Sequence, residues 1–182
     1  SGDRPAALAE LMGIILNDGV RLPVLRIDSL QFASGTPYET RVVNDPNRGK
    51  RVLPSEVATA LRGALSQVVD AGTAKRVAGS FKLADGTALA MGGKTGTGDN
   101  RIEAMGPGGR MLSSKSINRT ATFVFYIGAH HFGTLTAFVP GASAQHFTFT
   151  SALPVQVLKG MAPILNPLLQ PGDPTLCLAR QP

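Results

Sequence analysis

The sequence predicts an α+β fold, in which an antiparallel sheet is flanked by helices and closed by a helix at the carboxyl end. Apolar residues recur at helical spacing near both ends of the chain and once between them. The second half of the chain holds three consecutive segments of strand-like composition, joined by short or looped connections. Consecutive strands connected in this way favour antiparallel pairing.

A helix and a pair of strands are predicted for the first part of the chain. The helix begins after Asp3 and Pro5 and ends at 17–19, and its apolar face consists of Leu8, Leu11, Met12, Ile15 and Leu16. Short alternating stretches between 20 and 43 predict two strands joined by a turn at 33–36. The polar residues 44–49 favour a loop.

A second helix is predicted from Pro54 to Asp70. The apolar face that we expect it to bury is formed by Val57, Leu61, Ala64, Leu65 and Val68. Residues 87–100 then form an extended run that is apolar first and rich in Gly and Thr afterwards.

The remaining elements complete the sheet and cover it. We expect a long loop from Asp99 to Arg119, strands over 120–129 and 134–140, and a turn over 130–133. Residues 151–169 predict a closing helix, whose apolar residues are Val155, Val157, Leu158, Met161, Ile164 and Leu165. Residues 171–182 are expected to form an irregular tail.

The composition excludes several classes of protein. At 43% hydrophobic and 16% charged residues the chain is too apolar to be disordered, and its single Cys excludes an internal disulfide. The net charge of +6 comes from scattered basic residues with few aromatics among them, so we expect no nucleic-acid partner. The adjacent His130 and His131 would face opposite sides of a strand, so neither a metal nor a cofactor is expected.

The chain shows neither a targeting segment nor a membrane span. No apolar run reaches the roughly 18 residues that a span needs, and the start has no signal-peptide core. An initiator Met is also absent. We therefore expect a processed product or a piece of a longer protein.

The segment 92–98, GGKTGTG, carries the chemistry and has three interpretations. A phosphate-binding loop would match Gly93-Lys94-Thr95, but that motif also needs Gly where Ala88 stands and a helix directly after the Thr. A glycine-rich turn with a solvated Lys is the second interpretation. The third is K-T-G-T at a strand edge, where glycine admits a substrate backbone and Lys94 supplies a fixed positive charge. There the hydroxyls of Thr95 and Thr97 would bind a carboxylate, and an amide N–H would face an oxyanion.

K-T-G-T at Lys94–Thr97 resembles the penicillin-binding proteins, the serine D,D-transpeptidases of the β-lactamase-like superfamily, whose signatures are S-x-x-K, S-x-N and K-T-G in that order. The resemblance extends from about residue 4 to 168. Residues 17–23 are similar to the segment after S-x-N, 53–76 to the helix and Gly-Thr-Ala turn before K-T-G, 120–128 to the next strand and 151–165 to the closing helix. Residues 1–170 thus look like the C-terminal part of a transpeptidase domain.

Two of the three family signatures are missing from their expected places. None of the residues three positions before a Lys is Ser, so no S-x-x-K is present. Ser116-Ile117-Asn118 spells S-x-N but follows K-T-G, so we interpret it as chance. The nucleophile, its Lys base and the S-x-N loop are therefore expected before Ser1 in the parent, or in another chain. Apolar faces built to cover that missing half are expected to be exposed or to meet a partner chain.

The resemblance implies a role for each residue of the motif. Lys94 and the Thr95 and Thr97 hydroxyls would hold the carboxylate of a stem peptide ending in D-Ala-D-Ala, or that of a β-lactam. Gly96 belongs to the same substrate-binding strand, and the Thr97 backbone N–H would be one of two oxyanion-hole donors. The loop 99–119 is longer than the family usually has.

The resemblance also implies a function for the parent. It would be a periplasmic, membrane-anchored transpeptidase that cross-links peptidoglycan through an acyl-enzyme, with or without a glycosyltransferase domain, and this chain alone would be inactive. The alternatives are a non-catalytic binding or scaffold module of the same family and, more remotely, a nucleotide-binding loop protein.

Overall fold

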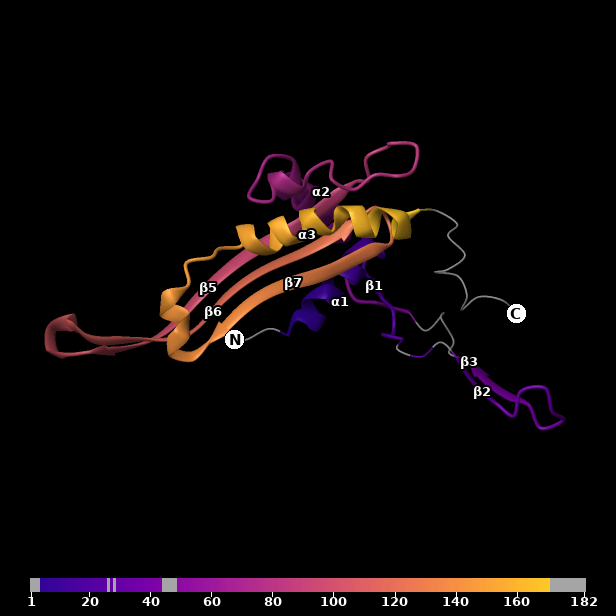
Figure 1. The fold of residues 1–182 in the computed structure, drawn as a ribbon, viewed down its shortest axis with the longest axis horizontal. Coiled ribbons are helices and arrows are strands. Elements are labelled where there is room, and N and C mark those ends of the chain that lie inside the picture. The colour runs from indigo at the N-terminus through magenta and orange to yellow at the C-terminus, as the bar shows by residue number, and fades with distance from the viewer. Residues whose placement is uncertain (1–3, 26, 28, 44–48, 171–182) are drawn as a thin grey trace.

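The computed structural model describes residues 4–25, 27, 29–43 and 49–170. Its main feature is a three-stranded antiparallel sheet of strands β5 (Met91–Met105), β6 (Met111–Ile127) and β7 (His131–Pro140), in the order β5-β6-β7 (Figure 1). The predicted α+β class with an antiparallel sheet is confirmed. The predicted tail 171–182 and most of the predicted loop 44–49 lie outside the described residues.

Three helices surround the sheet. They are α1 (Pro5–Leu16), α2 (Ser55–Asp70) and α3 (Ala152–Leu165), and all three were expected from apolar periodicity. Helices α1 and α3 both contact β6 and β7, on opposite faces of the sheet, and α2 packs against β5 (Figure 1). The 3-10 turns Lys75–Val77, Gly141–His146 and Asn166–Leu169 follow α2, β7 and α3.

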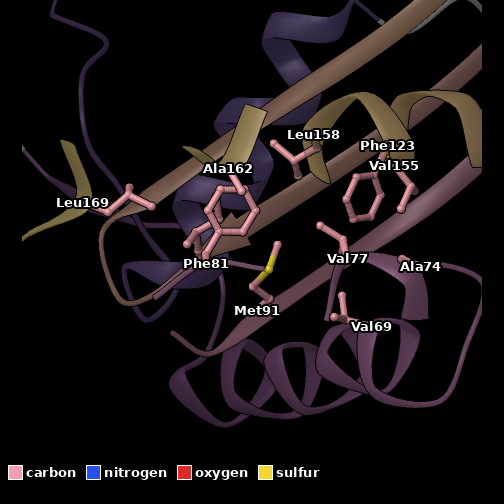
Figure 2. Packing of buried hydrophobic residues seen from close by; sticks show 11 residues of the cluster. Val69, Ala74, Val77, Phe81, Met91, Phe123, Val155, Leu158, Ala162 and Leu169 are labelled. Atoms are coloured by element: carbon pink, nitrogen blue, oxygen red, sulfur yellow. The ribbon is translucent and has the colours of Figure 1, made fainter. Parts of the chain in front are cut away.

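The main hydrophobic core lies between the sheet and α3. Figure 2 shows it as a cluster with contributions from α2, α3, the sheet and the segment after α2. Its members are Val69, Ala74, Val77, Phe81, Met91, Phe123, Ile127, Val155, Leu158, Ala162 and Leu169. This cluster holds β5 and β6 in place beneath α3, because buried apolar area is the dominant stabilising contribution to a fold.

The opposite face of the sheet is covered by α1. Gly13 of α1 packs on the ring of Phe132, where an added Cβ would lie 2.6 Å from the ring Cζ. Phe132 stands opposite Tyr126 in the β6–β7 ladder, so both rings lie on the α1 face. The Tyr126 hydroxyl donates to the Arg62 carbonyl at 3.4 Å, and burial raises the pKa of Tyr126 above its usual value.

Asp18 joins the end of α1 to the start of α2. Its carboxylate accepts a hydrogen bond from the Ser55 hydroxyl at 2.8 Å and lies 3.7 Å from Arg51 and 3.9 Å from Arg62. Arg51 belongs to β4 (Lys50–Arg51), which pairs with β1 (Val20–Arg21). A negative charge near the first turn of a helix is favourable, so Asp18 helps to place α2.

Strands β2 (Ser29–Phe32) and β3 (Thr40–Val43) form the predicted hairpin. Both strands are exposed along their whole length. Glu39 closes the hairpin end by accepting hydrogen bonds from the Gly35 N–H at 2.8 Å and from Gln31 at 2.6 Å, and these bonds lower the pKa of Glu39.

The predicted loop 99–119 is wrong, because β5 and β6 continue as a two-stranded hairpin through most of it. The ladder runs from Asp99 opposite Arg119 to Met105 opposite Met111, with irregularities after Asn100 and after Ala104. Since β7 ends opposite Asn118, residues 101–116 form a separate arm, visible beyond the sheet in Figure 1. The Pro107–Gly109 turn, with φ +72° and +74° at its two glycines, closes the arm.

The faces predicted for all three helices need correction. In α1 Met12 and Ile15 are buried as expected, but Leu11 is exposed. In α2 the buried residues are Ala58 and Val69, whereas Val57 and Leu61 are exposed. In α3 Val155 and Leu158 are buried as expected, but Val157 and Ile164 are exposed. The turn expected at 130–133 lies earlier, since β7 already begins at His131 and Gly128 takes φ +63°.

Among the described residues, no helix is both long and apolar enough to pass through a bilayer.

Candidate functional site

The K-T-G-T segment lies in the middle of β5, at an edge of the sheet. Lys94, Thr95, Gly96 and Thr97 stand opposite Val124, Phe123, Thr122 and Ala121 of β6. In the three-stranded sheet β5 pairs with β6 alone, and no strand among the described residues pairs with its other edge. The segment is thus extended, and the interpretation as a glycine-rich turn is wrong.

The register decides which backbone groups of β5 point to the free edge. The Gly128 N–H donates to the Ala90 carbonyl at 2.7 Å, which makes that opposed pair a hydrogen-bonded one. Such pairs alternate along an antiparallel ladder, and the register is unbroken from Met91 to Asn100. Consequently the N–H and C=O groups of Thr95 and Thr97 point away from β6. The outward bond from the Leu89 N–H to the Phe81 carbonyl, 2.9 Å, fits the same alternation.

The side chains of the motif lie on both faces of the strand. Thr95 is opposite Phe123, a core residue beneath α3, so Thr95 and Thr97 face α3 while Lys94 faces the other side. Even so, the Lys94 ammonium donates to the Thr95 carbonyl at 2.6 Å. Because that carbonyl points outward, the positive charge lies at the free edge of β5.

The Thr95 hydroxyl contacts the hydroxyl of Thr73, which is far from it in sequence. Thr95 is only 9% exposed, and its hydroxyl oxygen lies 2.7 Å from that of Thr73. Thr73 belongs to the Gly72-Thr73-Ala74 turn after α2, in which the Ala74 N–H donates to the Val68 carbonyl at 3.0 Å and Ala74 is fully buried. An anchored turn therefore sets the position of Thr73.

The Thr97 hydroxyl is fixed by the start of α3. It accepts a hydrogen bond from the N–H of Ser151, the residue that precedes the helix, at 2.9 Å. The oxygen of Thr97 therefore has one acceptor position occupied, and its proton remains to be donated elsewhere.

The glycines of the segment serve different purposes. A Cβ on Gly93 would lie 2.6 Å from the Phe123 ring and even closer to the Val124 carbonyl, so packing requires glycine there. A Cβ on Gly96 would meet no atom of the described residues within 4 Å. Since neither packing nor a positive φ accounts for Gly96, the space beside it is open to a ligand.

The structure also bears on the phosphate-binding loop and on the Ser116-Ile117-Asn118 sequence. The phosphate-binding loop is wrong, because β5 continues to Met105 where that motif requires a helix after Thr95. Asn118 of the Ser116-Ile117-Asn118 sequence lies in β6, and its side-chain oxygen accepts a hydrogen bond from Asn100 at 2.8 Å. Among the described residues, no group of three or more His, Cys, Asp or Glu side chains is arranged to hold a metal.

A cavity of about 920 Å³ lies elsewhere, along α1. It is bordered by Gly13 and Ile14 of α1, by Val20 and Leu22 after it, and by Phe132 of β7. None of the predicted site residues lines it.

Sequence reasoning did not assign a role to Thr73 or Ser151, which contact the two threonines of the motif. The Gly-Thr-Ala turn carried part of the family resemblance. The hydroxyl contact between Thr73 and Thr95 joins residues 22 positions apart, and the spacing of residues in the sequence does not reveal such a contact.

Solved structures of penicillin-binding proteins share the fold of this chain. Penicillin binding protein 3 from Mycobacterium tuberculosis, complexed with aztreonam, is 21% identical, with a TM-score of 0.52 over 86% of this chain and 33% of that one. The TP domain of Burkholderia pseudomallei penicillin-binding protein 3, in its apo form, is 21% identical, with a TM-score of 0.50 over 91% of this chain and 43% of that one. The chain thus spans less than half of either structure.

A search of curated proteins finds no match. The family model described as the penicillin binding protein transpeptidase domain matches residues 5–112, more than half of the 182 residues, and includes the K-T-G-T strand. The chain therefore belongs to the penicillin binding protein transpeptidase domain family.

Proposed function

We propose that this chain supplies the carboxylate-binding strand and part of the oxyanion hole of a peptidoglycan D,D-transpeptidase. The observation that carries the proposal is the free edge of β5. There the Lys94 ammonium and the outward backbone groups of Thr97 occur together, in a chain of the transpeptidase family. The nucleophilic serine, its Lys base and an S-x-N loop would come from the part of the protein before Ser1 or from another chain.

The reaction would be an acyl transfer in two steps. The serine oxygen bonds to the carbonyl carbon between the two D-Ala residues, the C–N bond breaks, and the terminal D-Ala leaves with the serine proton on its amine. An amino group of a second stem peptide then attacks the ester. The new amide forms, and the serine oxygen recovers a proton.

Each residue of the motif has a defined task in this reaction. Lys94 would form a charge-assisted hydrogen bond with the carboxylate of the terminal D-Ala, joined by the hydroxyls of Thr95 and Thr97. The outward N–H of Thr97 would stabilise the oxyanion, an interaction whose loss costs roughly 10²–10³ in rate in other acyl-transfer enzymes. The open space beside Gly96 would admit the substrate backbone.

β-Lactams that bear a carboxylate would occupy the same edge. The Mycobacterium tuberculosis relative has been solved in complex with ampicillin, a penicillin that bears such a carboxylate, which supports this choice of ligand. A peptidoglycan substrate would place the protein on the extracytoplasmic side of the membrane, with an anchor outside this chain.

A non-catalytic module of the same family is the second candidate. Such a module would bind carboxylate ligands at β5 without forming an acyl-enzyme.

Reaction with a penicillin tests the proposal. The full-length protein is expected to gain the mass of benzylpenicillin, whereas the 182-residue chain alone gains none. Lys94→Ala in the full-length protein should slow acylation more than tenfold, while Lys159→Ala, an exposed position on α3, should leave it unchanged. A mass shift of the isolated chain would overturn its assignment as inactive, and an unchanged rate in Lys94→Ala would remove the role of Lys94.

A further inference from the structure

We propose that Thr73 is a positioning residue, whose hydroxyl directs the proton of the Thr95 hydroxyl toward the bound carboxylate. This inference rests on the proposed function, since it concerns the same carboxylate site. The two hydroxyl oxygens lie 2.7 Å apart, and they come from the turn after α2 and from β5.

The direction of the hydrogen bond between Thr73 and Thr95 follows from the donors and acceptors that each hydroxyl has. A threonine hydroxyl has one proton to donate and two lone pairs with which to accept. If Thr95 donates its proton to a carboxylate, its oxygen must receive the proton of Thr73. The result is a chain from Thr73 to Thr95 to the carboxylate, in which each hydrogen bond polarises the next.

Burial makes this partner important. Because Thr95 is 9% exposed, little solvent is available to satisfy its oxygen. Without Thr73 the Thr95 oxygen would lose its donor, so the Thr95 O–H would be less polarised and no longer held in the orientation that points its proton at the carboxylate. The carboxylate would then lose a well-oriented donor.

The turn holds Thr73 ready for this task. A Cβ on Gly72 would lie 2.9 Å from the Val68 Cα and carbonyl oxygen, which shows how closely the turn approaches α2. Ala74 is fully buried on the other side of Thr73. Thr73 itself is exposed, at the boundary between this anchored turn and the free edge of β5.

Thr97 has an equivalent support that comes from the backbone. The Ser151 N–H, which donates to the Thr97 hydroxyl at 2.9 Å, is present whatever side chain stands at 151. Thr73 is therefore the support that a side-chain substitution can remove.

The test uses the full-length protein and two probes, benzylpenicillin and its methyl ester, in which the carboxylate is masked. Thr73→Val is expected to slow acylation by benzylpenicillin about three- to tenfold, the range of one hydrogen bond, and to leave the slower reaction of the ester unchanged. Thr73→Ser should restore the rate. The double variant Thr73→Val/Thr95→Val should react no more slowly than Thr95→Val alone.

A matched control is available in the sheet. Thr136→Val removes the contact of 3.2 Å between the Thr122 and Thr136 hydroxyls, which joins β6 and β7. It should change neither rate.

The outcomes separate this inference from the proposed function. If Thr73→Val slows acylation by benzylpenicillin and by its methyl ester equally, with or without a lower melting temperature, Thr73 has only a structural role and the inference is overturned. Additive effects of Thr73→Val and Thr95→Val would do the same. If Lys94→Ala slows acylation by benzylpenicillin strongly and Thr73→Val does not slow it, only the inference about Thr73 is rejected. If neither Lys94→Ala nor Thr95→Val changes the acylation rate, the proposed function is rejected.

Discussion

Strands β5 and β6 pair with each other in two regions that differ in the neighbouring elements and in the exposure of their side chains. From Met91 to Asp99, β5 lies beside a strand that β7 flanks on its other side, and Phe123 beneath α3 is 0% exposed. In the arm, residues 101–116, the same two strands pair only with each other, and every residue except Gly106 and the buried Ser116 is exposed, Ile102 to 61%. Backbone pairing alone therefore does not distinguish a strand that positions a site from one that extends into solvent. The difference is made by what covers the side chains.

The largest expected difference between the two regions is in stability. Phe123→Ala should lower the free energy of unfolding by about 3–5 kcal/mol, because it empties a fully buried position beneath α3. Ile102→Ala in the arm should change it by less than about 0.5 kcal/mol. Urea unfolding followed by circular dichroism measures both, and similar losses for the two variants would show that the arm packs against something.

The next largest effect is a difference in the free energy of unfolding between substitutions of two glycines in β5. Gly93→Ala should cost about 1–3 kcal/mol, because its Cβ would press on the Val124 carbonyl and the Phe123 ring. Gly96→Ala should leave the free energy of unfolding within about 0.5 kcal/mol of its original value, since its Cβ meets open space.

The same Gly96→Ala variant should react more slowly with benzylpenicillin in the full-length protein, because the new methyl group occupies ligand space. An unchanged acylation rate would contradict the assignment of that space to the substrate.

Removal of the arm should have a smaller effect on the fold. Arg101 and Ser116 are cross-strand partners, so replacement of 102–115 by Asn-Gly would close the ladder with a two-residue turn. The free energy of unfolding is expected to change by less than about 1 kcal/mol, because the replaced segment is exposed and the loop becomes shorter. A melting temperature far below that of the parent chain would show that the arm supports the sheet.

The smallest expected effect is a dependence of stability on pH that only the covered region should show. Burial raises the pKa of Tyr126, whose unfolded value is near 10.0, and the arm contains no tyrosine. Below pH 10 the residue is neutral in both states, so stability does not depend on it. Above pH 10 the unfolded chain releases the proton more readily, so stability falls as pH rises. Urea unfolding between pH 8 and 11 should show this fall, and Tyr126→Phe should reduce it.

The sequence predicted the helices and strands of the covered sheet well and the arm poorly. Apolar periodicity located all three helices, and the β-branched run 120–127 located β6, because buried faces leave a regular pattern. The arm was expected to be a loop, since residues exposed on both sides of a ladder need no alternation of apolar and polar side chains. The buried face of α2 was also misplaced. Its apolar residues include Val57 and Leu61, which face solvent in this chain.

For the candidate site, the sequence predicted the strand and the motif but not their supports. The K-T-G-T segment was expected to be extended, which the structure confirms, and the binding role of its residues stays a prediction. The contacts of Thr95 with Thr73 and of Thr97 with Ser151 depend on how distant segments pack, and no local pattern encodes them.

The hydrogen bond between Thr97 and Ser151 also has a consequence for biosynthesis. The two residues are 54 positions apart, and Ser151 precedes the helix that provides Val155 and Leu158 to the core. During translation the K-T-G-T strand emerges from the ribosome well before these partners do. The strand can therefore reach its final geometry only after α3 has been synthesised, and a nascent chain arrested before Ser151 would present β5 without its cover.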